Sequence, residues 1–160
     1  MKRMAIRGAV IALLGALAAS CSSATGPDTD LILAGTWSGT LGAGSGGGRA
    51  LRVTWTIAQN GLQLSGPVTV STSPAVTPTT FDGTITGTLS RSSQLTLSLA
   101  ARNAASGCAV NGTGTAAGSV FTIDGTLDVT FTGCGGLDVQ PPASNHVTLT
   151  KDRPAPFSGP

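Results

Sequence analysis

Few residues in this 160-residue chain could do chemistry. It has three cysteines and one histidine, His146, and all seven of its acidic residues are aspartates. Asp82 and Asp124 each begin an Asp-Gly-Thr-aliphatic sequence and fall on the polar faces of predicted strands. Their carboxylates could act as acids or metal ligands, but we favour solvated strand positions, which is the ordinary interpretation of such residues.

These residues do not assemble into a recognisable catalytic or nucleotide site. His146 has no evident acid partner, and no nucleophile turn is visible. Gly42, Gly44 and Gly47 satisfy G-x-G-x-x-G, but a predicted strand follows them, whereas a dinucleotide site needs a helix N-terminus there. A metal site formed by Cys108, Cys134 and His146 would lack a fourth ligand. We therefore expect no enzymatic activity, no metal and no cofactor.

The N-terminal 20 residues have the pattern of an export signal. Three cations within the first seven residues precede an apolar run at 8–19. The run is about a dozen residues long, whereas crossing a bilayer takes roughly 20, so we expect residues 1–20 to be removed. Loss of the three cations changes the net charge from +2 to −1, which argues against nucleic-acid binding.

The sequence Ala18-Ala19-Ser20-Cys21 resembles the lipobox of bacterial lipoproteins. The resemblance implies that Cys21 becomes the first residue of the mature protein. It further implies that Cys21 is acylated, with palmitate among the acyl chains, and that this lipid anchors the chain to a membrane. It also implies an exported protein at the cell envelope. Ser22, directly after the cysteine, resembles the residue that favours sorting to the outer membrane, in hosts that have an outer membrane. An ordinary signal peptide with a chance cysteine is the alternative.

Composition and pattern indicate a single β-domain after the signal. Charged residues make up only 10% of the chain, and its wealth of Ser, Thr and Gly favours strands over helices. We assign residues 21–34 to the lipidated cysteine and a flexible tether, 35–151 to the domain, and 152–160 to a C-terminal tail. About 140 residues suffice for one core.

Apolar and polar residues alternate with period two from Gly35 onward, which is typical of half-buried antiparallel strands. Tight turns at Asn60-Gly61, Arg91-Ser92-Ser93 and Ala117-Gly118 would join neighbouring strands. We therefore predict an all-β fold, a single antiparallel up-and-down β-barrel of about eight strands, with a β-sandwich as the alternative. The predicted strands are Gly35–Leu41, Leu51–Gln59, Leu62–Thr72, Thr79–Leu89, Leu95–Arg102, Ala109–Ala116, Ser119–Thr132 and His146–Lys151.

The sequence Gly35-Thr36-Trp37 at the start of the first predicted strand resembles the Gly-x-Trp of lipocalins. The resemblance implies a calycin-like barrel over 35–151 that Trp37 closes at one end. It further implies a basic side chain packed over the indole, and Lys151 or Arg153 could supply it. The Thr-Asp-Tyr motif of that family has no counterpart, because the chain contains no tyrosine.

Two cysteines remain once Cys21 is lipidated. An even pair in an exported domain is expected to form a disulfide. Cys108 precedes the sixth predicted strand and Cys134 follows the seventh, so both would lie at the same end of one hairpin. We therefore predict a Cys108–Cys134 disulfide.

The function depends on which way the apolar face turns and how full the barrel is. A transmembrane barrel would turn this face to lipid, but it needs aromatic girdles that the chain lacks. An eight-stranded barrel is filled by side chains or holds one small ligand. We expect a monomeric, non-enzymatic protein that binds a small apolar ligand inside the barrel. The expected lining of that cavity comprises Trp55, Phe81, Leu97 and Phe121.

The alternative is an envelope structural or protein-interaction module with a filled core. Its partner would meet the rim loops Gly42–Gly48 and Gly133–Asn145, which are the longest connections in the predicted barrel. The sequence identifies neither the ligand nor the protein partner.

Overall fold

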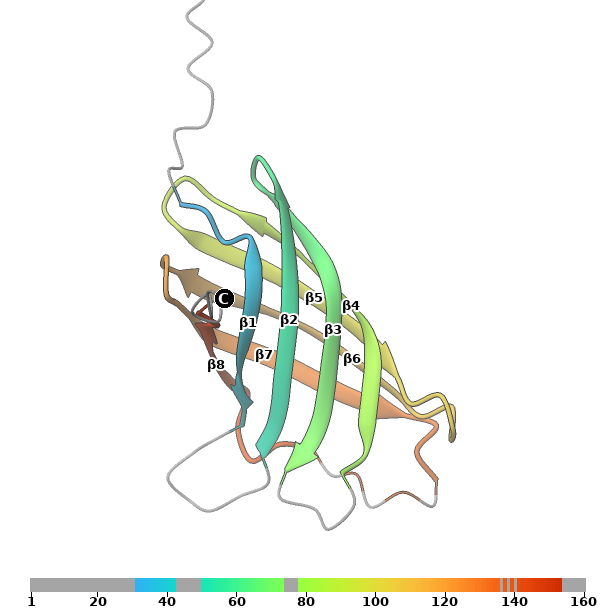
Figure 1. Ribbon diagram of the computed structural model, residues 1–160. Helices are drawn as coiled ribbons and strands as arrows, with labels where there is room; N and C mark the ends of the chain where they lie inside the picture. The colour runs from blue at the N-terminus through green and yellow to red at the C-terminus, as the bar shows by residue number, and fades with distance from the viewer. Residues whose placement is uncertain are drawn as a thin grey trace, which may run out of the picture.

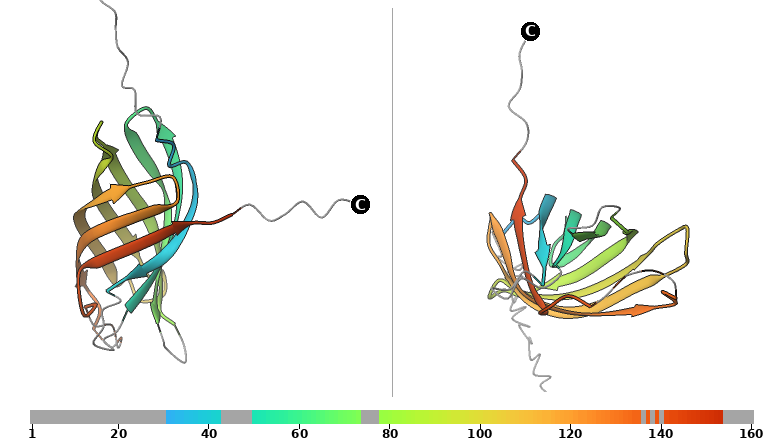
Figure 2. Two further views of the ribbon diagram at one scale, coloured as in Figure 1. Left: turned by 90° about the vertical axis from the view of Figure 1, so that its left-hand side faces the viewer. Right: turned by 90° about the horizontal axis from the view of Figure 1, so that it is seen from below.

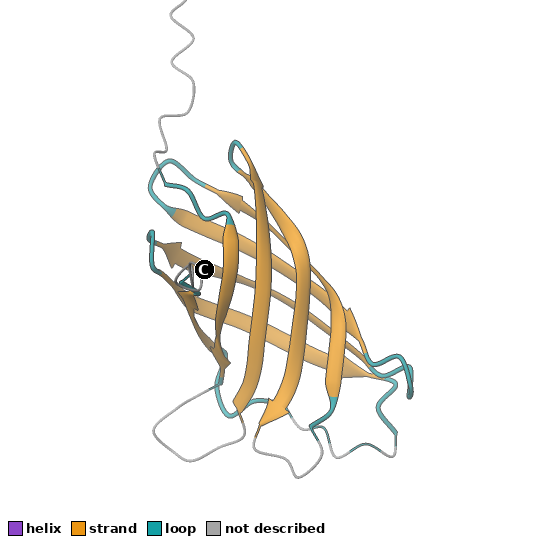
Figure 3. Ribbon diagram, in the orientation of Figure 1, coloured by secondary structure: helices purple, strands orange, loops and turns teal. Residues whose placement is uncertain are grey.

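The computed structural model describes residues 31–42, 50–73, 78–135, 137, 139 and 141–153. The predicted signal peptide, Cys21 and tether residues 22–30 lie outside the described residues. Within these ranges every element is a strand or a loop (Figure 3). No helix there has the length and apolarity that crossing a bilayer would take.

Eight antiparallel strands form a closed barrel in sequence order (Figure 1). They are β1 (Gly35–Leu41), β2 (Ala50–Asn60), β3 (Gln63–Ser73), β4 (Thr80–Leu89), β5 (Gln94–Arg102), β6 (Ala109–Gly118), β7 (Thr122–Thr132) and β8 (His146–Lys151). Trp37 on β1 lies opposite Trp55 on β2 and opposite Lys151 on β8. β8 runs alongside β1 in Figure 2. This closure confirms the predicted up-and-down barrel and excludes the sandwich.

The apolar side chains face inward, as the alternation predicted. Along β5, Leu95, Leu97 and Leu99 are buried while Thr96 and Ser98 are exposed. No buried polar or charged side chain occurs among the described residues. The outer wall is rich in Thr and Ser, which is the reverse of a lipid-facing barrel. Burying one large apolar side chain contributes about 1.5–3 kcal/mol, so this core is the main source of stability.

The hairpin between β2 and β3 is confirmed, one position later than the Asn60-Gly61 pattern indicated. Asn60 lies opposite Gln63, so Gly61 and Leu62 form the two-residue loop. Gly61 has a φ of 58° and Leu62 is not in the positive-φ region. A positive φ at the first loop residue alone matches a type II′ turn, which suits the twist of the flanking strands.

The β6–β7 turn differs from the prediction. Ala117-Gly118 is part of β6, and β7 begins at Thr122 rather than Ser119. The Ser119 hydroxyl accepts hydrogen bonds from the N–H groups of Phe121 (3.3 Å) and Thr122 (2.9 Å). Such local bonds compete with strand pairing. Phe121 therefore lies in the turn and is 72% exposed, so its predicted interior position is wrong.

Residues 31–34, which we had assigned to the tether, instead pack against one end of the barrel. The Leu33 side chain is fully buried in the core. Its N–H donates to Oε1 of Gln59 (2.6 Å), and its carbonyl accepts from Nε1 of Trp37 (2.6 Å). The barrel domain therefore begins before Gly35.

The predicted contact between Lys151 and Trp37 is present. Lys151 Nζ lies 5.5 Å from the centroid of the Trp37 ring. The same ammonium donates to the carbonyl of Ile32 (3.4 Å). A cation–π contact of this kind is worth about 0.5–2 kcal/mol. Lys151 thus joins the last strand to the first strand and to the segment that precedes it.

Close approach of neighbouring strands explains the inward-facing Gly125 on β7. A Cβ at this position would overlap the carbonyl oxygen of Thr115 and the Cβ of Ala116 on β6. The backbone of Gly125 is not in the left-handed region, so the restriction is steric. The absence of a side chain lets β6 and β7 coil closely enough for the barrel to close.

We predict that Gly125→Ala lowers the free energy of unfolding by about 1–3 kcal/mol, the usual cost of overpacking. The matched control is Gly135→Ala, because a Cβ there would meet nothing within 4 Å; its expected change is below about 0.5 kcal/mol. Urea unfolding followed by circular dichroism measures both. Equal stability of the two variants would contradict this account.

Candidate functional site

The strand connections give the two ends of the barrel different characters. The end that residues 31–34 cover, here called the near rim, has short hairpins at 61–62, 90–93 and 119–121. The opposite end, here called the far rim, has the longer connections, from β1 to β2, β3 to β4, β5 to β6 and β7 to β8; its described residues include 78–79, 103–108, 133–135 and 141–145 (lower end in Figure 1). The connections at the far rim are therefore longer than the turns at the near rim.

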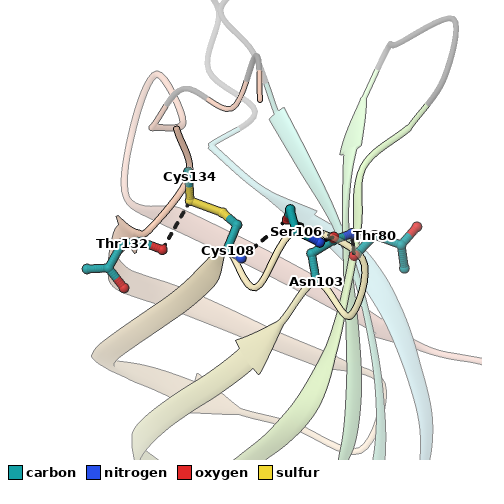
Figure 4. Close-up of a disulfide and its surroundings, with 6 residues drawn as sticks. All are labelled: Thr80, Asn103, Ser106, Cys108, Thr132 and Cys134. Carbon is teal, nitrogen blue, oxygen red and sulfur yellow. Dashed lines mark hydrogen bonds between the residues drawn. A yellow bond between two sulfur atoms is a disulfide. The ribbon is translucent and has the colours of Figure 1, made fainter. Parts of the chain in front are cut away.

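A disulfide joins two parts of the far rim. Cys108, in the β5–β6 loop, is bonded to Cys134, which follows β7, with their Cα atoms 4.5 Å apart (Figure 4). The predicted pairing is confirmed. Disulfides persist in oxidising compartments, so this bond indicates an extracytoplasmic protein.

Asn103 organises the β5–β6 loop beside the disulfide (Figure 4). Its side-chain N–H donates to the carbonyl of Thr80 on β4 (2.8 Å). Its side-chain oxygen accepts from the N–H (2.9 Å) and the hydroxyl (2.8 Å) of Ser106. The Ser106 hydroxyl then accepts from the N–H of Cys108 (3.2 Å). The loop is therefore held to β4 on one side and to Cys134 on the other.

A shallow groove of about 330 Å³ runs along the outer wall next to this loop. Its lining combines the polar residues Asp82, Arg102, Asn111 and Thr132 with three alanines, Ala100, Ala101 and Ala109. Asp82 on β4 lies directly opposite Arg102 on β5 and accepts a hydrogen bond from the Thr69 hydroxyl (2.8 Å). Charged and amide groups of this kind suit a polar partner, such as a peptide, rather than an apolar molecule.

No pattern in the sequence indicates this groove. It joins residues from four strands, and only their register brings them together. Asn103 and Ser106, shortly before Cys108, are residue types that favour turns, and they are the local signal that could have indicated a structured loop there.

No protein-family model matches this chain, and no curated protein or solved structure is significantly similar to it. The eight-stranded closed barrel is consistent with a calycin-like fold. The geometry of the described residues is thus the basis for a functional argument.

The expected ligand-lining residues inside the barrel leave little free space between them. Trp55 and Phe81 are 0% exposed and Leu97 is 5% exposed. A cavity large enough for a ligand would leave accessible area on its lining even if it were closed to bulk solvent. The fourth expected residue, Phe121, lies outside. Trp55 Nε1 is buried without a hydrogen-bond partner, which costs about 1–3 kcal/mol.

The only histidine, His146, is the first residue of β8 and lies on the outer wall next to β7. His146 Nε2 is 3.4 Å from Oδ2 of Asp124, and the imidazole is about half exposed. The expectation that His146 has no acid partner is therefore wrong, because the pairing of β7 with β8 brings Asp124 beside it. The same carboxylate oxygen accepts from the Thr148 hydroxyl (3.0 Å). Asp124 is therefore a solvated cross-strand hydrogen-bond acceptor, as favoured from the sequence. No group of three or more metal-ligating side chains occurs within the described ranges.

We predict that replacing Cys108 and Cys134 by serine lowers the free energy of unfolding by about 3–4 kcal/mol. The disulfide closes a loop with a sequence separation of 26, and this is its effect on the unfolded chain in the chain-entropy model. Thermal unfolding of the oxidised protein and the double variant tests the prediction. The matched control is Ser92→Ala in a near-rim turn. Unchanged stability of the double variant would show that strand pairing alone holds the far rim.

Proposed function

We propose that this chain is a lipid-anchored envelope protein whose filled barrel presents the far rim to a protein partner, without catalysing a reaction. The alternative from the sequence, an interaction module, is thus preferred over a carrier of a small apolar ligand. The observation that carries the proposal is the solvent-excluded interior, in which Trp55 and Phe81 have no exposed area.

The far rim supports the role of a binding surface. Its β5–β6 loop is fixed by the Asn103 hydrogen bonds and the disulfide, so little conformational freedom would be lost on association. The groove beside this loop offers Asp82 and Arg102 as opposite charges close together. Such pairs favour a partner of complementary polarity and fix its orientation.

The N-terminal sequence supports the lipid anchor. Cys21 follows an apolar signal segment and small residues, and the Cys108–Cys134 disulfide agrees with export. The contact of Lys151 with Trp37 matches the arrangement that the lipocalin resemblance implies. We therefore propose a lipocalin-like barrel at the cell envelope, on the outer membrane where the host has one.

The partner surface is tested by photocrosslinking in the producing cell. We predict that a photoreactive residue at Ala105, in the far-rim loop, gives a specific protein adduct, whereas one at Ser92, in a near-rim turn, does not. Arg102→Ala should reduce the Ala105 adduct severalfold, because it removes a charge from the groove. Equal adducts from both positions, or none from either, would refute the proposed partner surface.

Native mass spectrometry of the mature protein from its own host tests the filled interior. We expect the mass of the protein with its lipid alone. A further small molecule that stays bound to the wild type and is lost in a Trp55→Phe variant would instead support the ligand carrier.

The anchor is tested at Cys21. We predict that the N-terminal peptide of the mature protein begins at Cys21 and has the added mass of acyl chains. Cys21→Ser should move the protein from the membrane fraction to the non-membrane fraction, since it removes the atom that is acylated. The matched control is Ser23→Ala. An unmodified Cys21 peptide would refute the anchor and leave the partner surface unaffected.

A further inference from the structure

The large apolar side chains that are exposed in the described part of the chain gather at the near rim. They are Ile32, Val120 and Phe121, which are 63%, 47% and 72% exposed. Ile32 belongs to the segment that covers the barrel end, and the other two form the tip of the β6–β7 hairpin. We call these three side chains the near-rim patch.

Several contacts hold the two parts of the patch together. The backbone N–H of Lys151 donates to the carbonyl of Phe121 (3.0 Å), and its ammonium donates to the carbonyl of Ile32 (3.4 Å). A Cβ built on Gly118 would lie 3.4 Å from Leu33 and 3.6 Å from Leu31. The hairpin therefore lies beside the segment that contains Ile32, and both parts of the patch belong to the same end of the barrel.

The exposure of Phe121 is fixed by the hairpin. The Ser119 hydroxyl accepts hydrogen bonds from the N–H groups of Phe121 and Thr122. The backbone N–H of Lys151 donates to the Phe121 carbonyl. Keeping large apolar side chains in water is unfavourable. A fixed apolar group at the edge of a polar barrel is therefore typical of a contact site.

The size and position of the patch indicate a lipid bilayer as its partner. Stable protein interfaces use about 20–30 residues on each side, whereas a few apolar side chains suffice to strengthen an existing lipid anchor. Leu31 follows Cys21 by ten residues, so an acylated Cys21 would hold the near rim within about 35 Å of the bilayer at full extension.

Cations near the patch favour the same partner. Arg91 is exposed in the β4–β5 turn, and the Ser93 carbonyl of that turn accepts from the N–H of Gly118 (2.8 Å). Arg153 is exposed two residues after Lys151, and the exposed Asp152 between them accepts a hydrogen bond from the Ser38 hydroxyl (2.9 Å). Cationic side chains next to a membrane are attracted to anionic headgroups.

We propose that the near-rim patch inserts into the headgroup region of the bilayer that holds Cys21, so that the barrel stands on its near rim. This inference rests on the lipid anchor proposed above. Inserted Val120 and Phe121 would fix the orientation of the barrel, and the far rim would face away from the membrane.

The test uses the lipidated mature protein in vesicles of phosphatidylethanolamine and phosphatidylglycerol. An environment-sensitive fluorophore is attached to Val120→Cys or, as the matched control, to Ala143→Cys in the far-rim connection. We expect lipids with a quencher in the headgroup region to quench the fluorophore at 120 severalfold more strongly than the one at 143. Phe121→Ser in the Val120→Cys protein should weaken this difference.

Each other outcome overturns the inference in a distinguishable way. Equal quenching at 120 and 143 in a protein whose mass includes acyl chains would refute insertion and leave the anchor intact. A protein without acyl chains that does not bind the vesicles would refute both. Shielding of position 120 without vesicles, together with a doubled native mass, would show that the patch joins two copies of the chain.

Discussion

Pairing of β1 with β8 is the constraint on which the rest of this structure depends. It closes the sheet, so every strand pairs with a neighbour on both sides and the sheet has no edge strand. Trp37 lies at this closure, between Trp55 and Lys151. Because side chains alternate between the two faces, a slip of one residue here would turn apolar groups outward. The register that closes the barrel is therefore also the register that keeps the apolar side chains inside.

The same closure leaves the ends and the outer wall as the accessible surfaces of the barrel. The interior is occupied by Trp, Phe and aliphatic side chains with almost no accessible area. The wall is mostly hydroxyl groups, which bind water as readily as they bind a partner. What distinguishes one region from another is therefore the connections, and these differ sharply between the two rims.

The two rims are stabilised by different means. The near rim depends on contacts between separate segments of the chain. Leu33 is hydrogen-bonded to Gln59 and to Trp37, and the Lys151 ammonium lies over the Trp37 ring. The far rim depends on the Cys108–Cys134 bond and on Asn103. A covalent bond suits long connections, because strand pairing does not reach them. Under the proposed lipid anchor, this division would let the near rim meet a membrane while the far rim keeps a defined surface.

The sequence by itself determined the eight strands, their inward faces and the disulfide. These features are local or follow from neighbouring strands in a meander, so period-two alternation and cysteine positions suffice to predict them. Only the tertiary structure decided the closure of the barrel, the burial of Leu33 and the groove between Asp82 and Arg102. Alternation also misplaced Phe121, because a hydroxyl at Ser119 ended the pairing first. Strand register and sheet coiling depend on contacts between segments far apart in the sequence, so the pattern along one strand does not predict them. It also does not show where a side-chain hydrogen bond will end strand pairing.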